Sequence, residues 1–530
     1  MRKISLISIA MLIVSIPTFA GGLLTNTNQH PAFLRMLSRG ANTTSVDAAL
    51  SNPAGLAFLP KDGFYTSLSI QSAFQTRNID ASCEALGLDK YYEGKASAPV
   101  IPSVFAAYKK GDWTISGFFG ITGGGGKASF DDGLSMFDAM VIGGLLQQGI
   151  PGKAYTLNSY MDGKQYIYSV QLGLTYKITD WLSVFAGGRM NYFTGGYKGA
   201  LNASAAVDLP LPTGGAIPVG TELIGIDLDC SQTGWGFTPV IGLDAKFGKL
   251  TIGAKYEFKA NLNIENNTKI NSLRMIGAPE SELADYKHGV NTPNDIPAML
   301  SVAAAYEFLP VLRASVEYHF YDDKNAGMAG GKQKFLTKGT NEYLAGIEWD
   351  VIKRLTLSGG VQFTDYGLSD DYQSDTSFSC DSYSLGVGAK LQLSERADLN
   401  VGYMWTNYED YTKTGQNYQG TNLPGTNVYS RTNKVFGLSI DYRFCSFIIL
   451  YIRKRGCVAN SAGTSSLCLM PLGLLFLSFL LLSFYGFPCR FQKEYCTSRF
   501  MRLVWLVELS KFVRQPRRYS APTCLSLIHI

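Results

Sequence analysis

Charged residues and histidine are scarce in this sequence of 530 residues. Asp, Glu, Lys and Arg make up 17% of the chain, against about 25% in ordinary soluble domains. Four histidines are present, and no two of them have the spacing of a metal site. Glycine is abundant but lacks a three-residue period, which excludes a collagen-like chain. Because no two histidines have metal-site spacing, we expect no metal, and we also expect no cofactor.

The N-terminus has the three parts of a secretory signal peptide. Arg2 and Lys3 form a basic start, residues 4–16 form an apolar stretch, and residues 18–20 (Thr-Phe-Ala) form a cleavage site of the small-x-small type. We interpret residues 1–20 as a signal peptide, so the mature protein is expected to be exported.

The dominant pattern between residues 63 and 444 is alternation with a period of two. In residues 250–264 one side of the predicted strand is wholly apolar and the other wholly polar or small, since alternate side chains point to opposite faces. The apolar side is formed by Leu250, Ile252, Ala254, Tyr256, Phe258, Ala260, Leu262 and Ile264. Such strands are longer than most globular strands and suit a membrane, which needs about 9–11 residues per strand.

The alternating segments number fourteen, the even count expected of a bacterial outer-membrane barrel. Short turns and long loops alternate between them, so both barrel ends should lie in the periplasm. We therefore predict an all-β protein, a 14-stranded antiparallel transmembrane β-barrel over 63–444 in the bacterial outer membrane. The predicted strands are 63–78, 100–109, 112–122, 164–177, 181–198, 234–247, 249–265, 297–308, 311–323, 340–352, 355–366, 381–393, 397–410 and 431–444. The predicted long loops are 79–99, 123–163, 199–233, 266–296, 324–339, 367–380 and 411–430, with room for a hairpin above the membrane within 201–230.

Residues 21–62 precede the first strand, do not alternate, and are short enough to lie inside the barrel. The run 40–57 (GANTTSVDAALSNPAGLA) resembles the N-terminal hatch of the long-chain fatty-acid transporter (FadL/TodX) family of outer-membrane proteins. Its Asn-Pro-Ala core precedes the first strand, as in that family. The resemblance covers about 21–444, and it implies a hatch or plug at 21–62 inside the lumen whose key residues are Asn52, Pro53, Ala54 and Gly55.

The resemblance also implies a mechanism. A hydrophobic ligand, such as a long-chain fatty acid, is captured by extracellular loops and enters a lumenal pocket. The hatch then moves, and the ligand leaves sideways at a kinked third strand. Transport is passive, since an apolar molecule gains nothing from a water-filled pore.

Three groups of residues are candidates for this route. An apolar stripe near helical spacing in the loop after the third strand is expected to meet the ligand or to pack on other loops. Lumenal polar residues on the predicted strand 311–323 are expected to form a hydrogen-bond network or to contact a ligand carboxylate. Glycines in the third strand mark the expected kink. The first group contains Phe137, Met140, Val141 and Leu145, the second Arg313, Glu317 and His319, and the third Gly117, Gly120 and Gly123.

The sequence does not favour an enzyme. Residues 123–127 approach a phosphate-binding loop, but Ile121 and Ala128 stand where that motif needs Gly and Ser or Thr. No nucleophile, base and acid set can be assembled, so no catalytic residue is expected. The alternative function is a structural or adhesive barrel whose loops bind a partner. The expected partners are a hydrophobic ligand, outer-membrane lipid and the barrel-assembly machinery. We expect a monomer. We expect no nucleic acid, because the positive net charge of +5 comes from residues 445–530 alone.

Residues 445–530 differ in composition from the rest of the chain. They contain 11 Lys and Arg against 2 Asp and Glu, whereas residues 1–444 contain 36 and 40. Three of the nine cysteines, Cys83, Cys230 and Cys380, precede residue 445, and their pairing is not readable from the sequence. The last residues resemble the translation of a sequencing-library transposon end. We interpret 445–530 as a non-barrel tail and a translation or assembly artefact.

Overall fold

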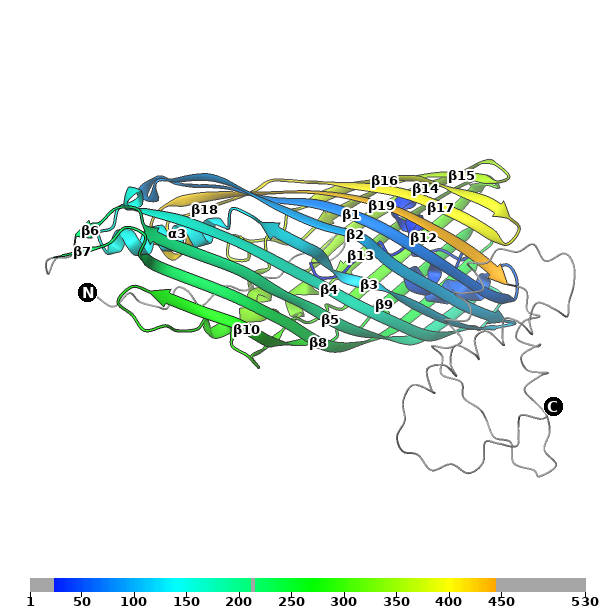
Figure 1. The fold of residues 1–530 in the computed structure, drawn as a ribbon. Helices are drawn as coiled ribbons and strands as arrows, with labels where there is room; N and C mark the ends of the chain where they lie inside the picture. Colours follow the sequence, from blue (N-terminus) through cyan, green and yellow to red (C-terminus); the bar gives the residue numbers. More distant parts are fainter. Residues whose placement is uncertain (1–22, 211–214, 445–530) are drawn as a thin grey trace, which may run out of the picture. The chain divides into compact units, whose positions relative to one another are not determined.

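The computed structural model describes residues 23–210 and 215–444, and residues 63–444 form a closed antiparallel barrel (Figure 1). The fourteen-stranded fold predicted from the alternation is confirmed. The wall contains β1 (Gly63–Cys83), β2 (Leu88–Lys110), β3 (Trp113–Phe130), β4 (Tyr155–Lys177), β5 (Leu182–Ala205), β8 (Glu222–Phe247), β9 (Leu250–Glu257), β10 (Asn263–Met275), β12 (Met299–Leu309), β13 (Leu312–Tyr321), β14 (Thr340–Ile352), β15 (Leu355–Asp365), β16 (Ser382–Ser394), β17 (Ala397–Tyr408) and β19 (Gly425–Phe444). Four short strands, β6 (Leu209–Pro210), β7 (Ala216–Ile217), β11 (Asn291–Pro293) and β18 (Tyr411–Gly415), belong to the loops.

The barrel closes where its first and last strands meet. β1 pairs with β19 from Phe64 opposite Phe444 to Ser82 opposite Thr426. β9 and β10 together make the seventh crossing, because both pair with β8 and the chain between them leaves the ladder. The predicted strand 249–265 is therefore two strands, and the second of them continues beyond the predicted end to Met275.

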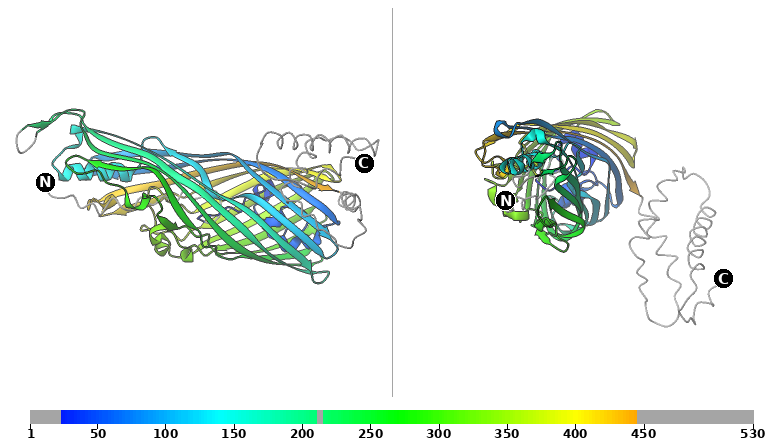
Figure 2. Two further views of the ribbon diagram at one scale, coloured as in Figure 1. Left: turned by 60° about the horizontal axis from the view of Figure 1, so that its bottom comes forward. Right: turned by 60° about the vertical axis from the view of Figure 1, so that its left-hand side comes forward.

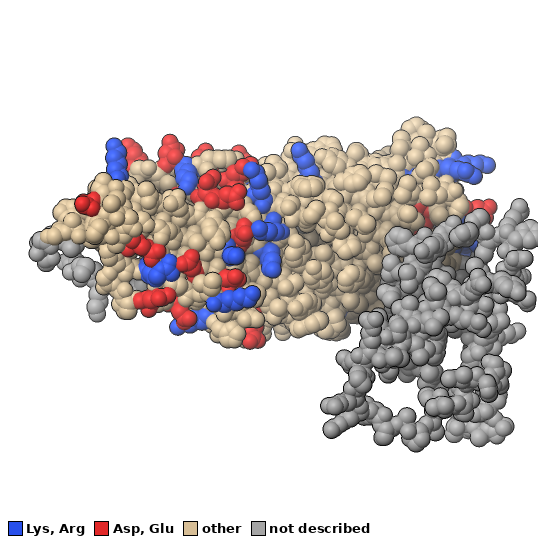
Figure 3. All heavy atoms as spheres, in the orientation of Figure 1, with Lys and Arg blue, Asp and Glu red and all other residues tan. Residues whose placement is uncertain are grey.

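The two faces of the wall have the predicted orientation. On β9, Lys255 and Glu257 point inward and are buried, and the Lys255 ammonium donates to the backbone oxygen of Leu50 at 2.8 Å. Tyr256, between them, lies on the outer face. The face of the barrel shown in Figure 3 carries a belt with almost no Lys, Arg, Asp or Glu, which lies between two charged ends. This belt is the part of the wall that lipid can cover.

Several predicted loops are strands instead. Residues 79–99, predicted as a loop, continue β1 and β2 as a hairpin with a tight connection at Glu84–Leu86. The physical reason is a reversal of the pattern above the membrane. Within the membrane apolar side chains such as Ile70 and Phe74 point outward, whereas beyond it Ile79 and Ala81 point inward and are buried. The strand extensions on β5 and β8 likewise form the hairpin predicted within 201–230.

The extracellular end is a packed structure and not a set of separate loops. It contains α3 (Ser135–Gln147) together with the 3₁₀ helices η3 (Glu84–Leu86), η4 (Gly152–Ala154), η5 (Ala284–Tyr286), η6 (Asp323–Asn325), η7 (Ala329–Phe335) and η8 (Tyr418–Gly420). Its core joins apolar residues of the strand extensions to those of α3. No helix in the described residues has the length and apolar character needed to cross a membrane.

Residues 23–62 form the hatch, which lies inside the ring of strands (Figure 2). The hatch contains α1 (Pro31–Met36), α2 (Ala48–Ser51) and the 3₁₀ helix η2 (Pro53–Phe58). α1 lies against β14 to β17 and β19. Its backbone approaches the wall so closely that a Cβ on Gly346 or Gly360 would lie 2.1 or 1.9 Å from the oxygen of Met36. These two glycines therefore allow the docking of α1.

The predicted signal peptide 1–20 and tail 445–530 lie outside the described residues.

Candidate functional site

The Asn-Pro-Ala turn of the hatch docks on the wall near the short-turn end of the barrel. Asn52 is buried, and its side-chain amide donates to the backbone oxygen of Asn42 at 3.2 Å and to the Asp244 carboxyl group. The oxygens of Pro53 and Ala54 accept from hydroxyl groups of β4 and β5, each at 2.8 Å. A defined turn inside the lumen thus joins the hatch to three wall strands.

Gly55 completes the turn. Its backbone N–H donates to the oxygen of Asn52 at 2.9 Å. A Cβ at this position would lie 2.4 Å from the oxygen of Asn42 and 2.5 Å from the Asn52 side chain. Both distances are shorter than any tolerated contact, so the turn requires glycine.

Of the lumenal residues predicted on β13, Glu317 and His319 come together, and Glu317 contacts the hatch. One oxygen of Glu317 accepts from the backbone N–H groups of Arg39 and Gly40, at 2.7 and 2.8 Å. Its other oxygen accepts from Ser301 at 3.0 Å and contacts the His319 ring at 2.6 Å. The Glu317 carboxylate is therefore fully engaged in holding residues 39–40 against the wall.

Arg313 belongs to a neighbouring network of charges. Its guanidinium contacts Glu348 at 2.7 Å and Asp350 at 2.9 Å. The Glu348 carboxylate also forms an ion pair with the Arg35 guanidinium of the hatch, at 2.5 Å. Buried charges are costly unless paired, and here the pairs run from the hatch to the wall. The predicted contact of Arg313, Glu317 and His319 with a ligand stays a prediction.

The wall has a gap between β2 and β3. These strands pair from Lys110 to Val104 and again from Ser97 to Gly94, but residues 98–103 of β2 have no ladder partner on β3. The ladder between β3 and β4 is also irregular, with shifts between Ile121 and Gly126. A gap in a membrane barrel leaves backbone groups that need other partners.

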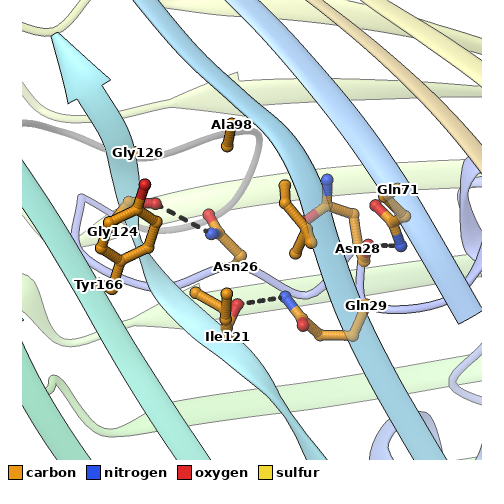
Figure 4. Close-up of a pocket in the computed structure, with 10 residues that line it drawn as sticks. Asn26, Asn28, Gln29, Gln71, Ala98, Ile121, Gly124, Gly126 and Tyr166 are labelled. Atoms are coloured by element: carbon orange, nitrogen blue, oxygen red, sulfur yellow. Dashed lines mark hydrogen bonds between the residues drawn. The ribbon is translucent and has the colours of Figure 1, made fainter.

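The N-terminal segment of the hatch supplies those partners (Figure 4). Asn26 donates its backbone N–H to the oxygen of Thr122 at 2.7 Å and its side-chain amide to Gly124 at 3.4 Å. The Gln29 side chain donates to the oxygen of Ile121 at 2.7 Å. Thr25 and Gly123 form an isolated β-bridge. Residues 25–29 thus seal the gap from inside the barrel.

The seal is held by neutral groups and is imperfectly satisfied. The ion pairs found in the described residues join the hatch to the wall only from His30 onward. The buried side-chain oxygens of Asn26 and Gln29 have no hydrogen-bond partner. These two residues also line a cavity of about 10 Å³ beside the gap, close to the minimum volume for one water molecule. Residues 25–29 are also bound by Gln71 and Ser103, which donate to the backbone oxygens of Asn28 and Gln29, each at 2.6 Å. Hydrogen bonds and not ion pairs therefore join this segment to the wall.

The glycines of the predicted kink divide into two groups. Gly117 lies in regularly paired strand, opposite Ala106 and Leu172, whereas Gly120 and Gly123 lie in the gap. The sequence reasoning missed Gly124 and Gly126, which have φ values of +92° and +82°. The run of four glycines at 123–126 was the available signal, because such φ values favour glycine.

The apolar residues predicted after the third strand form α3. Phe137, Val141 and Leu145 are buried in the extracellular core, and Met140 packs against it, so the helix has no broad exposed stripe. Phe137 lines an apolar cavity of about 30 Å³ together with Met161, Tyr197, Leu201 and Tyr286. This volume holds a few water-sized groups at most, so a hydrocarbon enters only if these side chains move.

The cysteines and the possible metal ligands form no further site within the described residues. Cys83, Cys230 and Cys380 are free thiols, each buried in or beside the extracellular core. Within residues 23–210 and 215–444 no group of His, Cys, Asp and Glu is arranged to hold a metal ion.

Comparisons with known proteins bear on the fold and the location. Residues 276–444 match the family model described as "Outer membrane protein beta-barrel domain". A comparison with curated protein sequences gave no match. Together with the lipid-compatible belt, the family match places the chain in the bacterial outer membrane.

Solved structures with the same fold include hydrophobic-compound transporters. A FadL homologue from Pseudomonas aeruginosa has a TM-score of 0.58 at 15% identity, covering 82% of this chain and all (100%) of that one. The toluene transporter TbuX from Ralstonia pickettii gives 0.50 at 14% identity, covering 79% and 100%. The toluene transporter TodX from Pseudomonas putida gives 0.50 at 15%, covering 82% and 100%. The predicted resemblance is thus confirmed at the level of the fold.

Proposed function

We propose that this chain is a member of the FadL/TodX family and carries hydrophobic small molecules passively across the outer membrane. The observation that carries the proposal is the gap between β2 and β3, sealed by residues 25–29 of the hatch and not by wall hydrogen bonds. A barrel built only for strength or adhesion has no use for an incomplete wall, because every unpaired backbone group in lipid is costly.

The route begins at the extracellular end. A hydrophobic ligand enters the apolar cavity beside Phe137, where burial of its surface supplies the binding free energy at about 25 cal/mol per Å². Because this cavity is small when empty, binding requires movement of α3 or of the loop that carries Tyr286. Met140, Val141 and Leu145 act in this step through the packing of α3.

The route ends at the gap. When residues 25–29 move away from β3, the lumen opens sideways into the hydrocarbon layer, where an apolar ligand is most stable. The hatch from His30 to Phe58 stays in place, because its ion pairs and buried hydrogen bonds hold it to the wall. Within this fixed part of the hatch, Asn52, Pro53, Ala54 and Gly55 dock on the wall, and Glu317 holds residues 39–40. Arg313 and His319 act indirectly, through their contacts with Glu348 and Glu317.

The ligand class includes long-chain fatty acids and neutral hydrocarbons. Neither an energy source nor a catalytic step is needed, since the movement is downhill. The protein works as a monomer, inserted by the barrel-assembly machinery and surrounded by outer-membrane lipid. The fold of the FadL homologue and of the toluene transporters supports this proposal.

Uptake by whole cells tests the proposal. The chain is expressed in a Gram-negative host without its own transporter for hydrophobic compounds, and initial uptake is measured for a fluorescent fatty acid, toluene and a disaccharide. We expect faster uptake of one or both hydrophobic compounds and unchanged uptake of the sugar. Uptake of both at the rate of cells that lack the protein, at confirmed surface levels, would favour the adhesive alternative. Faster uptake of the sugar would indicate an open pore.

A further inference from the structure

Lysines mark the upper border of the lipid-facing belt on one side of the barrel. On β4 the outer face is apolar from Tyr176 through Val170 and changes to charge at Lys164. On β19 it is apolar from Tyr442 through Phe436 and changes to charge at Lys434. In the space-filling view, basic atoms lie along the edge of the uncharged belt (Figure 3). The first charged groups beyond the hydrocarbon layer on these strands are therefore cationic.

Strand register places three of these lysines in one row. Lys434 pairs with Phe74, Phe74 with Ser97, Ser97 with Lys127, and Lys127 with Lys164. The row thus runs without interruption over β19, β1, β2, β3 and β4, and all its members lie on the outer face. We call Lys127, Lys164 and Lys434 the lysine row.

Carboxylates lie outside the row, farther from the membrane. Asp162 is two residues beyond Lys164 and binds Lys127 at 3.0 Å, and Glu93 binds Lys95 at 2.9 Å. Lys198 lies level with Asp162, opposite Asp229. Within the described residues, Lys164 and Lys434 form no ion pair. From β19 to β4 the charge that meets the membrane is therefore positive, and the negative groups lie behind it. Farther round the barrel, on β10, the outward-facing Glu265 is level with Tyr166, so the positive border is confined to this side.

Lys127 and Lys164 are direct neighbours across the β3–β4 ladder. Opposed like charges destabilise a sheet unless an anion lies between them, and Asp162 contacts only one of the two. Neighbouring strands are about 4.8 Å apart, so both ammonium groups can reach one phosphate. Lys127 is the residue of β3 at which pairing with β2 resumes beyond the gap, and Lys164 lies next to it on β4.

We propose that the lysine row binds the phosphate groups of the phosphorylated glycolipid, lipopolysaccharide, that forms the outer leaflet of the bacterial outer membrane. Each of the three lysines is the first outward-facing charged group beyond the apolar outer face of its own strand. That is the level of the lipid headgroups, and the charge of the lysines is complementary to the phosphates. This interaction holds a lipid headgroup over the gap, so that the gap opens into acyl chains and not into water. It rests on the outer-membrane location and not on any transported ligand.

The test measures binding of purified lipopolysaccharide, and of the same lipid after enzymatic dephosphorylation, to the full chain in neutral detergent. Lys127→Gln with Lys164→Gln and Lys434→Gln is compared with a matched triple at the opposite border, Lys110→Gln with Lys249→Gln and Lys353→Gln. Each lysine near an anionic surface contributes a factor of about five. We therefore expect affinity for the phosphorylated lipid to fall by on the order of 100-fold in the first triple and to change little in the second.

The charge-preserving triple, with Arg at the same three positions, should bind like the wild type. Equal binding of phosphorylated and dephosphorylated lipid by the wild type would overturn the inference, and this comparison needs no variant to fold. Equal losses in the two Gln triples, or equally tight binding of phosphatidylglycerol vesicles, would also overturn it.

Discussion

Replacement of Glu317 by Gln should release the middle of the hatch while the barrel stays intact. One oxygen of this carboxylate accepts from the N–H groups of Arg39 and Gly40, and the other meets Ser301 and His319. An amide is neutral and has one oxygen. When that oxygen faces Arg39 and Gly40, the two bonds lose their charge-assisted strength, and when the amide is reversed they are lost. Hydrogen bonds to a charged group are worth about 1.5–3 kcal/mol each and neutral ones about 0.5–1.5 kcal/mol. We expect local opening of residues 37–44 to become easier by about 2–3 kcal/mol.

Hydrogen exchange followed by mass spectrometry measures this change. Each 1.4 kcal/mol is a factor of about ten, so exchange in the peptide covering 37–44 should accelerate on the order of 100-fold. Glu307→Gln, an exposed residue on β12, is the matched control and should change nothing. The folded barrel should migrate normally in unheated gels. Exchange within about threefold of wild type, with the barrel folded, would refute the assigned role of Glu317.

Further predictions concern the turn, the lipid face and the outer cavity. Gly55→Ala should displace the Asn52 turn and alter uptake of a hydrophobic compound at matched surface levels. Gly144→Ala, where a Cβ meets open space, should not alter uptake. Equal uptake in the two variants would show that the turn has no part in the mechanism. Tyr256→Arg should destabilise the barrel by about 2–4 kcal/mol if the side chain lies at the membrane midplane. Denaturant unfolding in lipid measures this change, with Tyr256→Phe as the control. An unchanged stability would mean that Tyr256 does not face lipid. Phe137→Ala should weaken binding of a hydrophobic fluorophore, while Leu146→Ala, on the same helix but 45% exposed, should not; equal effects would place the binding site elsewhere.

The strand pattern within the membrane was readable because lipid imposes one rule over the whole belt. Apolar side chains face outward there, so residues such as Ile252 and Tyr256 alternate with buried polar ones. Beyond the membrane the rule reverses, as Ile79 and Ala81 show on β1. The alternation of outward apolar residues therefore predicts strand ends that come too early, and it predicts residues 79–99 as a loop.

The candidate site was only partly readable. The position of the Asn-Pro-Ala turn and the glycine-rich third strand followed from local residue types, which backbone geometry constrains directly. The contacts of Glu317 with Arg39 and Gly40 join positions about 280 residues apart in sequence and depend on how the hatch sits in the lumen. The role of residues 25–29 had no signal, since Asn26 and Gln29 are ordinary polar residues until the gap in the wall gives them partners.

The central claim is that residues 25–29 open the gap between β2 and β3, and a reversible crosslink tests it most directly. Asn26 and Thr122 directly follow the antiparallel bridge between Thr25 and Gly123, and the backbone nitrogen of Asn26 lies 2.7 Å from the oxygen of Thr122. Facing Cβ atoms in such pairs lie about 4.5–5.5 Å apart, close to the disulfide range. A control pair, Thr76→Cys with Thr432→Cys, joins β1 to β19 on the outer face.

Uptake of a hydrophobic compound is measured in Asn26→Cys with Thr122→Cys, first oxidised and then reduced in the same cells. We predict that oxidation stops uptake and that reduction restores it, whereas the control pair transports equally in both states. Full uptake with the crosslink shown to be formed would refute the opening of the gap by residues 25–29, because the ligand would then leave by a path that does not need these residues to move.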